Sequence, residues 1–205
     1  MSVYFYLKMA NKGSVKILGI VGSPRKRSNT EILVKKALEG TKWVATVDAE
    51  MVLLRNKNIQ LCKGCYDICY FKKIRCPIHD DMEELLVKLL KADGYIFGTP
   101  TYFGGVSGLM RIFMDRTVPI FGKLKDKIAG IVSVGDGKFG GQELAAQSIR
   151  TFCLNHSMIL AEWHVSGTAG KRGEILNDID VLEKARKMGQ NIARLAVILH
   201  SKMTP

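Results

Sequence analysis

Four of the five cysteines in this 205-residue chain lie within one short stretch, at spacings that suit a single inorganic centre. They are Cys62, Cys65, Cys69 and Cys76, separated by two, three and six residues. Four thiolates on one loop can surround a compact centre, because the intervening backbone curls over the bound metal. A disulfide between Cys62 and Cys65 would be strained, and we find no secretory signal. The pattern therefore predicts a metal-holding loop over residues 62–76.

The cysteine loop by itself leaves three interpretations open. Cysteines bunched in one run are typical of a [4Fe-4S] cluster, and Gly64 and Pro77 favour the same interpretation. Zinc also binds four thiolates, although its sites usually consist of two paired knuckles with a long spacer. Unmetallated, redox-active thiols are the third possibility. Cys153 lies apart in an apolar stretch and is most simply a small buried hydrophobic residue.

Composition favours one domain. The hydrophobic content is 47% and no linker is evident, so we expect a single domain over residues 15–205 after a basic extension at residues 1–14. The sequence contains no run of 18 apolar residues, so we expect no membrane-spanning helix. We expect a cytoplasmic protein. The net charge of +12 would suit nucleic acid, an anionic membrane surface or an acidic protein, and charge alone does not choose among them. A zinc-containing nucleic-acid binder is disfavoured by the strand-end loops, the aromatic content of 8% and the absence of a nucleic-acid motif, so we expect neither nucleic acid nor a membrane as partner.

Hydrophobic periodicity alternates between strands and helices along the chain. The capping pair Ser28 and Glu31 opens the first helix, and Asp80 and Asp81 suit the start of the second. Strands are expected over 15–21, 47–54, 94–98, 129–134 and 158–165, and helices over 28–38, 79–90, 109–116, 142–154 and 181–199. This alternation is typical of a parallel sheet with helices on both faces.

Polar and glycine-rich loops follow three of the predicted strands, where parallel sheets bind ligands. The loop after the first strand combines hydroxyls, an amide, arginines and a helix N-terminus, which suits a phosphate, although an ordinary capped helix would look similar. It lacks the Walker A and dinucleotide-binding patterns. The loop after the third strand offers Tyr102 and Phe103 beside a planar ring, and the loop after the fourth has four glycines. We expect a mononucleotide with a flat aromatic head.

Four motifs together resemble the NADPH-dependent FMN reductase family: Gly22-Ser-Pro-Arg-Lys-Arg-Ser-Asn-Thr, Gly98-Thr-Pro-Thr-Tyr-Phe-Gly-Gly-Val-Ser-Gly, Met114-Asp-Arg and Gly140-Gly-Gln-Glu. With the cysteine loop after the second strand, the chain is similar to the iron-sulfur flavoprotein branch of that family. The resemblance implies an α/β, flavodoxin-like, doubly wound five-stranded parallel sheet of order 2-1-3-4-5. It also implies FMN at the strand ends and a [4Fe-4S] cluster on Cys62, Cys65, Cys69 and Cys76.

The same resemblance assigns the flavin contacts. Phosphate contacts are expected at Ser23, Arg25, Ser28, Asn29 and Thr30. Ring and ribityl contacts are expected at Pro100, Thr101, Tyr102, Phe103 and Gly104, with Gly135, Gly140 and Gly141 on the other side. No histidine is assigned a catalytic role.

These assignments predict an oxidoreductase that passes electrons between the cluster and FMN. Basic residues around the cysteines, Lys63, Lys72, Lys73 and Arg75, suit an acidic ferredoxin-like carrier, although a solvated basic loop would look the same. The resemblance also implies a homo-oligomer, a dimer or a tetramer. The alternative is an NAD(P)H-dependent FMN or quinone reductase whose cysteine loop holds structural zinc or no metal.

Overall fold

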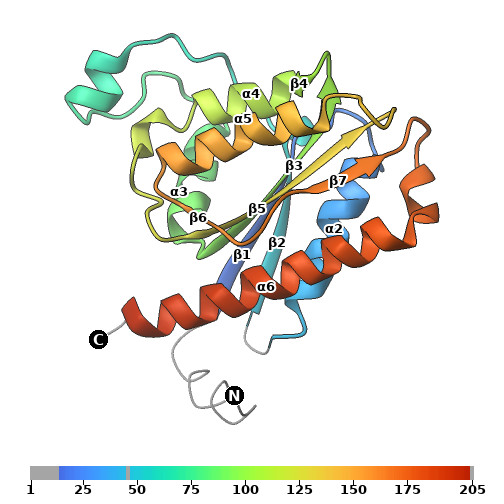
Figure 1. Cartoon of the computed structure of the whole chain (residues 1–205). Helices are drawn as coiled ribbons and strands as arrows, with labels where there is room; N and C mark the ends of the chain where they lie inside the picture. Colours follow the sequence, from blue (N-terminus) through green and yellow to red (C-terminus); the bar gives the residue numbers. More distant parts are fainter. Residues whose placement is uncertain (1–13, 45–46, 204–205) are drawn as a thin grey trace.

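The computed structural model describes residues 14–44 and 47–203. It contains one central sheet in which β2, β1, β3, β5 and β6 follow one another as parallel neighbours (Figure 1). This is the predicted order 2-1-3-4-5, with β5 and β6 as the fourth and fifth strands. Residues 1–13 of the predicted N-terminal extension lie outside the described residues.

The five helices and the first four predicted strands lie where the sequence predicts them, but α3 begins at Met82 rather than at residue 79, and β3 continues past residue 98 to Tyr102. The strands are β1 (Val15–Val21), β2 (Val47–Leu53), β3 (Gly94–Tyr102), β4 (Gly105–Val106), β5 (Ile128–Gly135), β6 (Ile159–Leu160) and β7 (Val165–Thr168). The α-helices are α2 (Asn29–Thr41), α3 (Met82–Lys91), α4 (Gly108–Asp115), α5 (Gln142–Asn155) and α6 (Ile179–Met203). Short 3₁₀ turns lie at Leu54–Asn56, Val118–Ile120 and Glu174–Asn177, and a π-turn at Asp67–Phe71.

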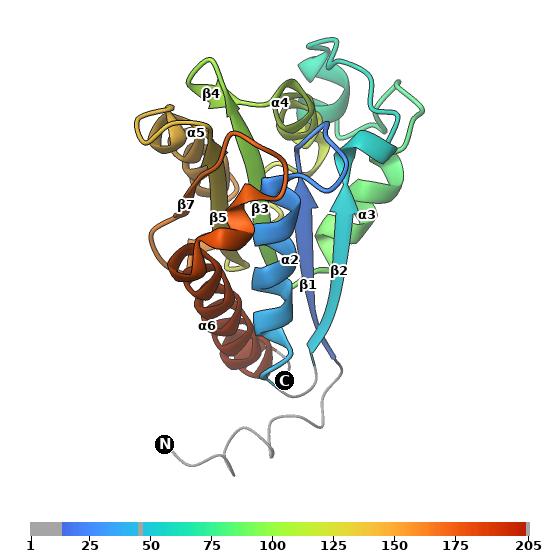
Figure 2. The ribbon, with the colours of Figure 1, turned by 90° about the vertical axis from the view of Figure 1, so that its right-hand side faces the viewer.

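Helices cover both faces of the sheet. Buried side chains of α3, α4 and α5 pack with one face of the strands, and those of α2 and α6 pack with the other. Figure 2 shows α2 and α6 side by side. Glycine makes this close packing possible, because a Cβ at Gly189 would lie 1.8 Å from the carbonyl oxygen of Ala37. Among the described helices, none is long and apolar enough to cross a membrane.

The last strand differs from its expected form. The sequence predicts a continuous strand over 158–165, but β6 ends at Leu160 and β7 begins at Val165 and continues to Thr168. Both pieces pair with β5 in parallel. Between them, the exposed Trp163 ring lies beneath the guanidinium of Arg150, 4.2 Å from the ring centroid. Interruptions of this kind are common on edge strands, where no further strand enforces a continuous ladder.

A buried histidine makes this fold sensitive to acid. His156 is 2% exposed, its Nε2 lies 3.0 Å from Thr117 Oγ1, and burial lowers its pKa to about 4. The unfolded chain binds a proton near the ordinary value of 6.5, so stability is complete above that pH and is lost as pH falls toward 4. We expect this group to cost about 3 kcal/mol at pH 4. Urea unfolding of the protein and of His156→Gln at pH 7 and 4.5 checks this, and equal losses in both would contradict it.

Residues 57–81, which we call the cysteine segment, connect the end of β2 and its 3₁₀ turn to the start of α3. The sheet and the helices that cover it form the body of the protein. In Figure 1 the cysteine segment is the teal stretch that extends away from the sheet. Its contact with the body includes Tyr70, whose ring lies edge-on to Phe121 at 5.6 Å between centroids.

Candidate functional site

A cleft of about 600 Å³ opens at the carboxyl ends of β1, β3, β5 and β7. Twelve of the thirteen residues expected to contact a flavin line it: Ser23, Arg25, Ser28, Asn29, Thr30, Pro100, Thr101, Tyr102, Phe103, Gly104, Gly135 and Gly140. These residues come from three loops far apart in the sequence, and the sheet brings the loops together. The thirteenth, Gly141, does not line the cleft but supports one of its walls.

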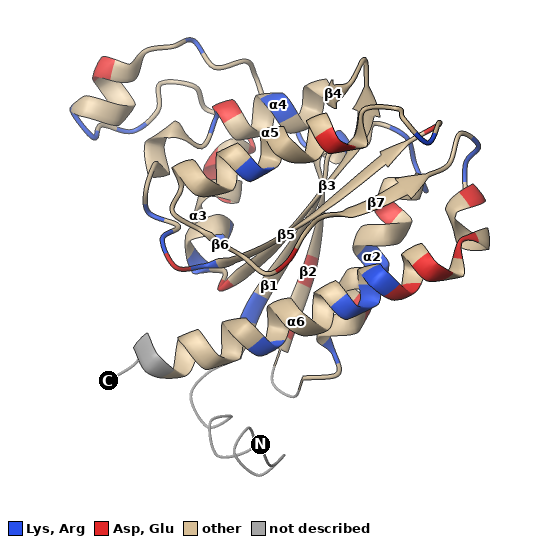
Figure 3. Cartoon of the chain, viewed as in Figure 1, with Lys and Arg blue, Asp and Glu red and all other residues tan. Residues whose placement is uncertain are grey.

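One side of the cleft is built for an anion. Ser28 caps α2, and its Oγ accepts a hydrogen bond from the N–H of Glu31 at 3.1 Å. The first backbone N–H groups of a helix have no intrahelical partner and are available to a phosphate. Arg25 and Arg172 line the same cleft and add positive charge. Figure 3 shows basic residues on both loops that carry them, at the same end of the sheet.

The predicted capping box is only half formed. The side chain of Glu31 does not return to Ser28 but pairs with Arg55 at 2.9 Å, and both side chains are largely buried. Arg55 also donates to the carbonyl of Arg25 at 3.4 Å. The pairing compensates the negative charge of Glu31 beside the anion site. Through its contact with the Arg25 carbonyl, Arg55 also holds the loop between β1 and α2 in place.

Asn29 has a structural partner that its motif does not indicate. Its side-chain amide donates to the carbonyls of Lys171 at 2.8 Å and Ala169 at 3.2 Å. Its Oδ1 accepts from the N–H of Ile175 at 3.5 Å. Asn29 therefore fastens the loop after β7 to the first turn of α2.

The other side of the cleft suits a planar ring. Phe103 has a positive φ of 49° and is fully exposed at the rim, next to the half-exposed Tyr102. Gly104 and Gly141 bring the loops after β3 and β5 into contact, since a Cβ at Gly141 would lie 2.5 Å from the Cα of Gly104. Only glycine fits there, and φ at Gly141 is 84°.

Five lining residues were not expected from the sequence: Val134, Asp136, Ala169, Gly170 and Arg172. Three of them lie on the loop after β7, whose glycines and basic residues were the available signal. That loop follows the split edge strand, so its position depends on where the strand resumes.

The cleft contains a polar atom that lacks a partner. Thr101 lines the cleft, and its buried Oγ1 has no hydrogen-bond partner among the described residues. A buried hydroxyl without a partner costs about 1–3 kcal/mol. A flavin with its many polar atoms is a fitting partner for this hydroxyl.

Replacing Thr101 with valine is expected to have opposite effects on the two forms of the protein. The ligand-free form should become more stable by about 1 kcal/mol, while FMN affinity should fall about fivefold to tenfold, because the hydroxyl no longer binds the ligand. Thermal unfolding without ligand and fluorescence titration with FMN measure the two effects. Unchanged FMN affinity would place the hydroxyl outside the ligand site.

The four clustered cysteines are free of disulfides; Cys69 is buried and the other three are half-buried. Burial raises the pKa of the Cys69 thiol, and the negative charges of Cys65 and Cys76 raise it further. The Cys69 thiol contacts the carbonyl of Cys65 at 3.8 Å. Cys153 is separate from them, buried against the helices α3 to α5, and its pKa is raised by burial to about 12.

Within residues 14–44 and 47–203, no three His, Cys, Asp or Glu side chains are gathered to hold a metal ion. The donor set nevertheless fits a thiolate-held centre. Cys65, Cys76 and Cys62 lie close enough to Cys69 for their negative charges to raise the pKa of the Cys69 thiol, and a bound cation relieves that repulsion. To bind a metal centre, the loop over residues 62–76 would have to bring its four cysteine sulfur atoms closer together.

Comparison with known proteins identifies the family of this chain and several similar proteins. The model of the family described as NADPH-dependent FMN reductase matches residues 15–170. An iron-sulfur flavoprotein of Methanocaldococcus jannaschii is 38% identical over 90% of this chain and 99% of its own. A putative NAD(P)H-dependent FMN-containing oxidoreductase of Bacillus subtilis is 29% identical over 85% and 96%. A solved flavone reductase shares the fold, with a TM-score of 0.70 at 23% identity over 91% of this chain and 64% of that one.

Proposed function

Because the chain belongs to the NADPH-dependent FMN reductase family, a family of flavin-dependent oxidoreductases, we propose that it is an electron-transfer iron-sulfur flavoprotein. FMN occupies the strand-end cleft, and Cys62, Cys65, Cys69 and Cys76 hold a [4Fe-4S] cluster. The observation that carries the FMN assignment is the convergence of twelve expected residues on one cleft. The likeness to an iron-sulfur flavoprotein over 90% of the chain supports the cluster.

Each wall of the cleft has a distinct task in this proposal. The α2 N-terminus, Ser28 and Thr30 bind the phosphate, and Arg25 compensates its charge. The loops after β3 and β5 enclose the ring, with Tyr102 at the rim. When bound, FMN takes electrons singly or in pairs and a [4Fe-4S] cluster takes one at a time, so the pair converts between the two.

The first experiment is purification without air, followed by assays for FMN, iron, acid-labile sulfide and zinc. We expect FMN with equal amounts of iron and sulfide, and an electron paramagnetic resonance signal after reduction. FMN with neither iron nor sulfide would refute the cluster and leave the flavin assignment intact.

A second candidate is an NAD(P)H-dependent FMN or quinone reductase whose cysteine segment holds zinc or no metal. It is favoured by the likeness to the Bacillus subtilis oxidoreductase. Stoichiometric zinc without sulfide, together with rapid flavin reduction by NAD(P)H, would establish it instead.

We also propose a ferredoxin-like carrier as electron partner. Basic residues are spread along the cysteine segment, with Asp67 as the acidic exception between Lys63 and Arg75 (Figure 3). Arg75 is paired with Glu83, whereas Lys63 and Lys72 have no ion-pair partner in the described part of the chain. Reduction by ferredoxin in a stopped-flow instrument should slow as ionic strength rises. An unchanged rate would exclude electrostatic steering.

Self-association into a dimer or tetramer is part of the same proposal. The cysteine segment exposes large apolar side chains, with Phe71 73%, Leu61 70%, Ile74 55% and Tyr66 51% exposed. Exposed apolar groups of this kind are typical of interaction surfaces. Sedimentation analysis of the holoprotein and of Phe71→Glu should show dissociation in the variant.

A further inference from the structure

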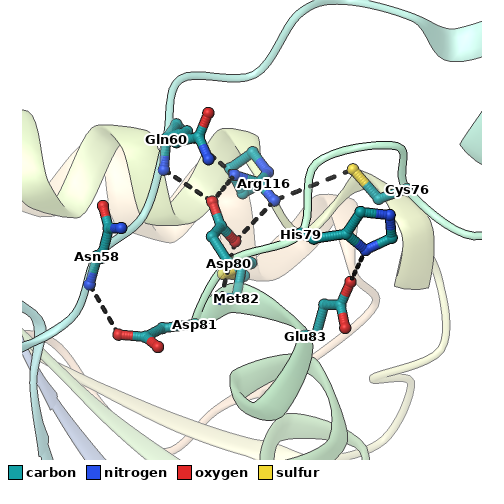
Figure 4. A network of polar contacts seen from close by, with 9 residues as sticks. All are labelled: Asn58, Gln60, Cys76, His79, Asp80, Asp81, Met82, Glu83 and Arg116. Atoms are coloured by element: carbon teal, nitrogen blue, oxygen red, sulfur yellow. Dashed lines mark hydrogen bonds and ion pairs between the residues drawn. The ribbon is translucent and has the colours of Figure 1, made fainter.

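A buried ion pair lies at the base of the cysteine segment. Arg116, just after α4, pairs with Asp80, just before α3, through two contacts of 2.7 and 3.0 Å (Figure 4). The arginine side chain is 3% exposed and the aspartate side chain 0%. Burial raises the pKa of Asp80, but hydrogen bonds from Arg116 and from backbone N–H groups outweigh this and hold the pKa below its usual value.

Hydrogen bonds between its two arms close the neck of the segment. On the entering arm, the N–H of Asn58 donates to Asp81 Oδ2 and the N–H of Gln60 donates to Asp80 Oδ2, both at 2.8 Å. The N–H of Asp81 donates a hydrogen bond to the carbonyl of Asn58 at 3.2 Å. The four cysteines thus lie on a loop whose ends are already joined without any metal.

Arg116 contacts both arms and one of the thiols. Its Nη1 donates to the carbonyl of Gln60 at 2.8 Å, and its Nη2 points at Cys76 Sγ at 3.9 Å (Figure 4). The planar guanidinium donates in several directions at once, which lysine cannot reproduce. One side chain of the body therefore contacts the entering arm, the returning arm and a ligand sulfur.

Helix α4 connects this contact to the flavin cleft. Ser107 caps its other end, and Ser107 Oγ donates to the carbonyl of Gly22 at 2.5 Å, directly before the anion-binding loop. The N–H of Ser107 donates to Thr99 Oγ1 at 3.0 Å, on the strand that leads into the ring-binding loop. The helix is fixed at both ends.

We propose that Arg116, oriented by Asp80, is a positioning residue for the thiolate-held centre. It holds the neck of the cysteine segment in place and supplies a charged N–H donor to the Cys76 sulfur. The donor stabilises the more negative, reduced form of the centre, because hydrogen bonds to ligand sulfurs raise its reduction potential. The second role rests on the cluster of the proposed function, and the first concerns the iron-free chain.

The experiment compares three variants with the wild type. Arg116→Gln removes both the positive charge and the planar guanidinium with its several N–H donors. Arg116→Lys keeps the positive charge but not the guanidinium. Arg116→Met with Asp80→Asn replaces the ion pair without leaving a buried charge, so it remains testable if the single variants fail to fold. Arg111→Gln is the matched control, because Arg111 lies on α4, little more than one turn before Arg116, with a 61% exposed side chain paired to Asp115.

Two measurements address the two roles. Amide hydrogen exchange over residues 57–81 of the iron-free protein measures how stably the two arms of the neck are joined. We expect at least tenfold faster exchange in Arg116→Gln and in the double variant. An anaerobic redox titration of the loaded protein reports the donor. At a fixed potential the reduced-to-oxidised ratio should fall about tenfold in Arg116→Gln, which is 59 mV for a one-electron couple. The Arg111→Gln control should match the wild type in both.

The outcomes separate the inference from the proposed function. Wild-type exchange rates over residues 57–81 in Arg116→Gln and in the double variant would overturn the neck role. An unchanged potential in variants that retain iron would overturn the donor role. A wild-type protein without iron or sulfide would refute the cluster and with it the donor role, while the exchange measurement would still decide the neck role.

Discussion

Replacing Cys69 with serine is expected to reduce iron and acid-labile sulfide to background while leaving FMN stoichiometric. Cys69 is the buried member of the four clustered cysteines, and in the proposed function its sulfur is one of the four cluster ligands. Serine is a poor ligand for iron because its hydroxyl is not ionised at neutral pH, whereas a metal-bound thiol is deprotonated. Iron, sulfide and flavin assays on the anaerobically purified variant measure the result.

Cys153→Ala provides the matched control. This fifth cysteine lies on α5 and faces the core, away from the cysteine segment, so the variant should keep iron at the wild-type level. The control should lose only the modest stability expected from a small buried side chain, about 1 kcal/mol. If Cys69→Ser kept its iron, the four-thiolate assignment would be wrong.

Replacing Asn29 with aspartate is expected to weaken FMN binding about 100-fold. The carboxylate would face the carbonyls of Ala169 and Lys171, to which the amide now donates, so the loop after β7 would lose its tie to α2. Two lost hydrogen bonds and a negative charge beside the phosphate together cost about 2.7 kcal/mol. The helix itself should survive, because aspartate is favourable in a first helical turn.

Fluorescence titration with FMN measures this effect, and circular dichroism verifies the fold. Asn155→Asp adds the same charge at an exposed position at the far end of α5 and should bind FMN like the wild type. Wild-type affinity in Asn29→Asp would show that the flavin phosphate does not bind at the start of α2.

Much of the candidate site is predictable from the sequence because it depends on local rules. The inner strand β5 is buried over all eight of its residues, and the loops that follow parallel strands emerge at one edge of the sheet. That is why residues as distant as Ser23, Thr101 and Gly140 line one cleft. The start of α2 is equally clear from Ser28.

The remainder depends on contacts between distant residues, which no local pattern records. Glu31 was expected to complete a capping box but pairs with Arg55, 24 residues away. Asp80 has the sequence position of a helix-start residue, yet it forms a buried ion pair with Arg116, 36 residues away. The predicted edge strand is interrupted between Leu160 and Val165, where the Trp163 ring lies against the guanidinium of Arg150. In each case a tertiary partner overrides a local preference.

The length of α4 has an evolutionary consequence. Its N-terminal Ser107 binds beneath the anion loop, and Arg116, one residue past its end, binds the neck of the cysteine segment. An inserted or deleted residue would rotate one end against the other by about 100° and shift it by about 1.5 Å. Arg116 would then turn away from Asp80. We therefore expect orthologues that keep this ion pair to tolerate substitutions within α4 but no change in its residue count.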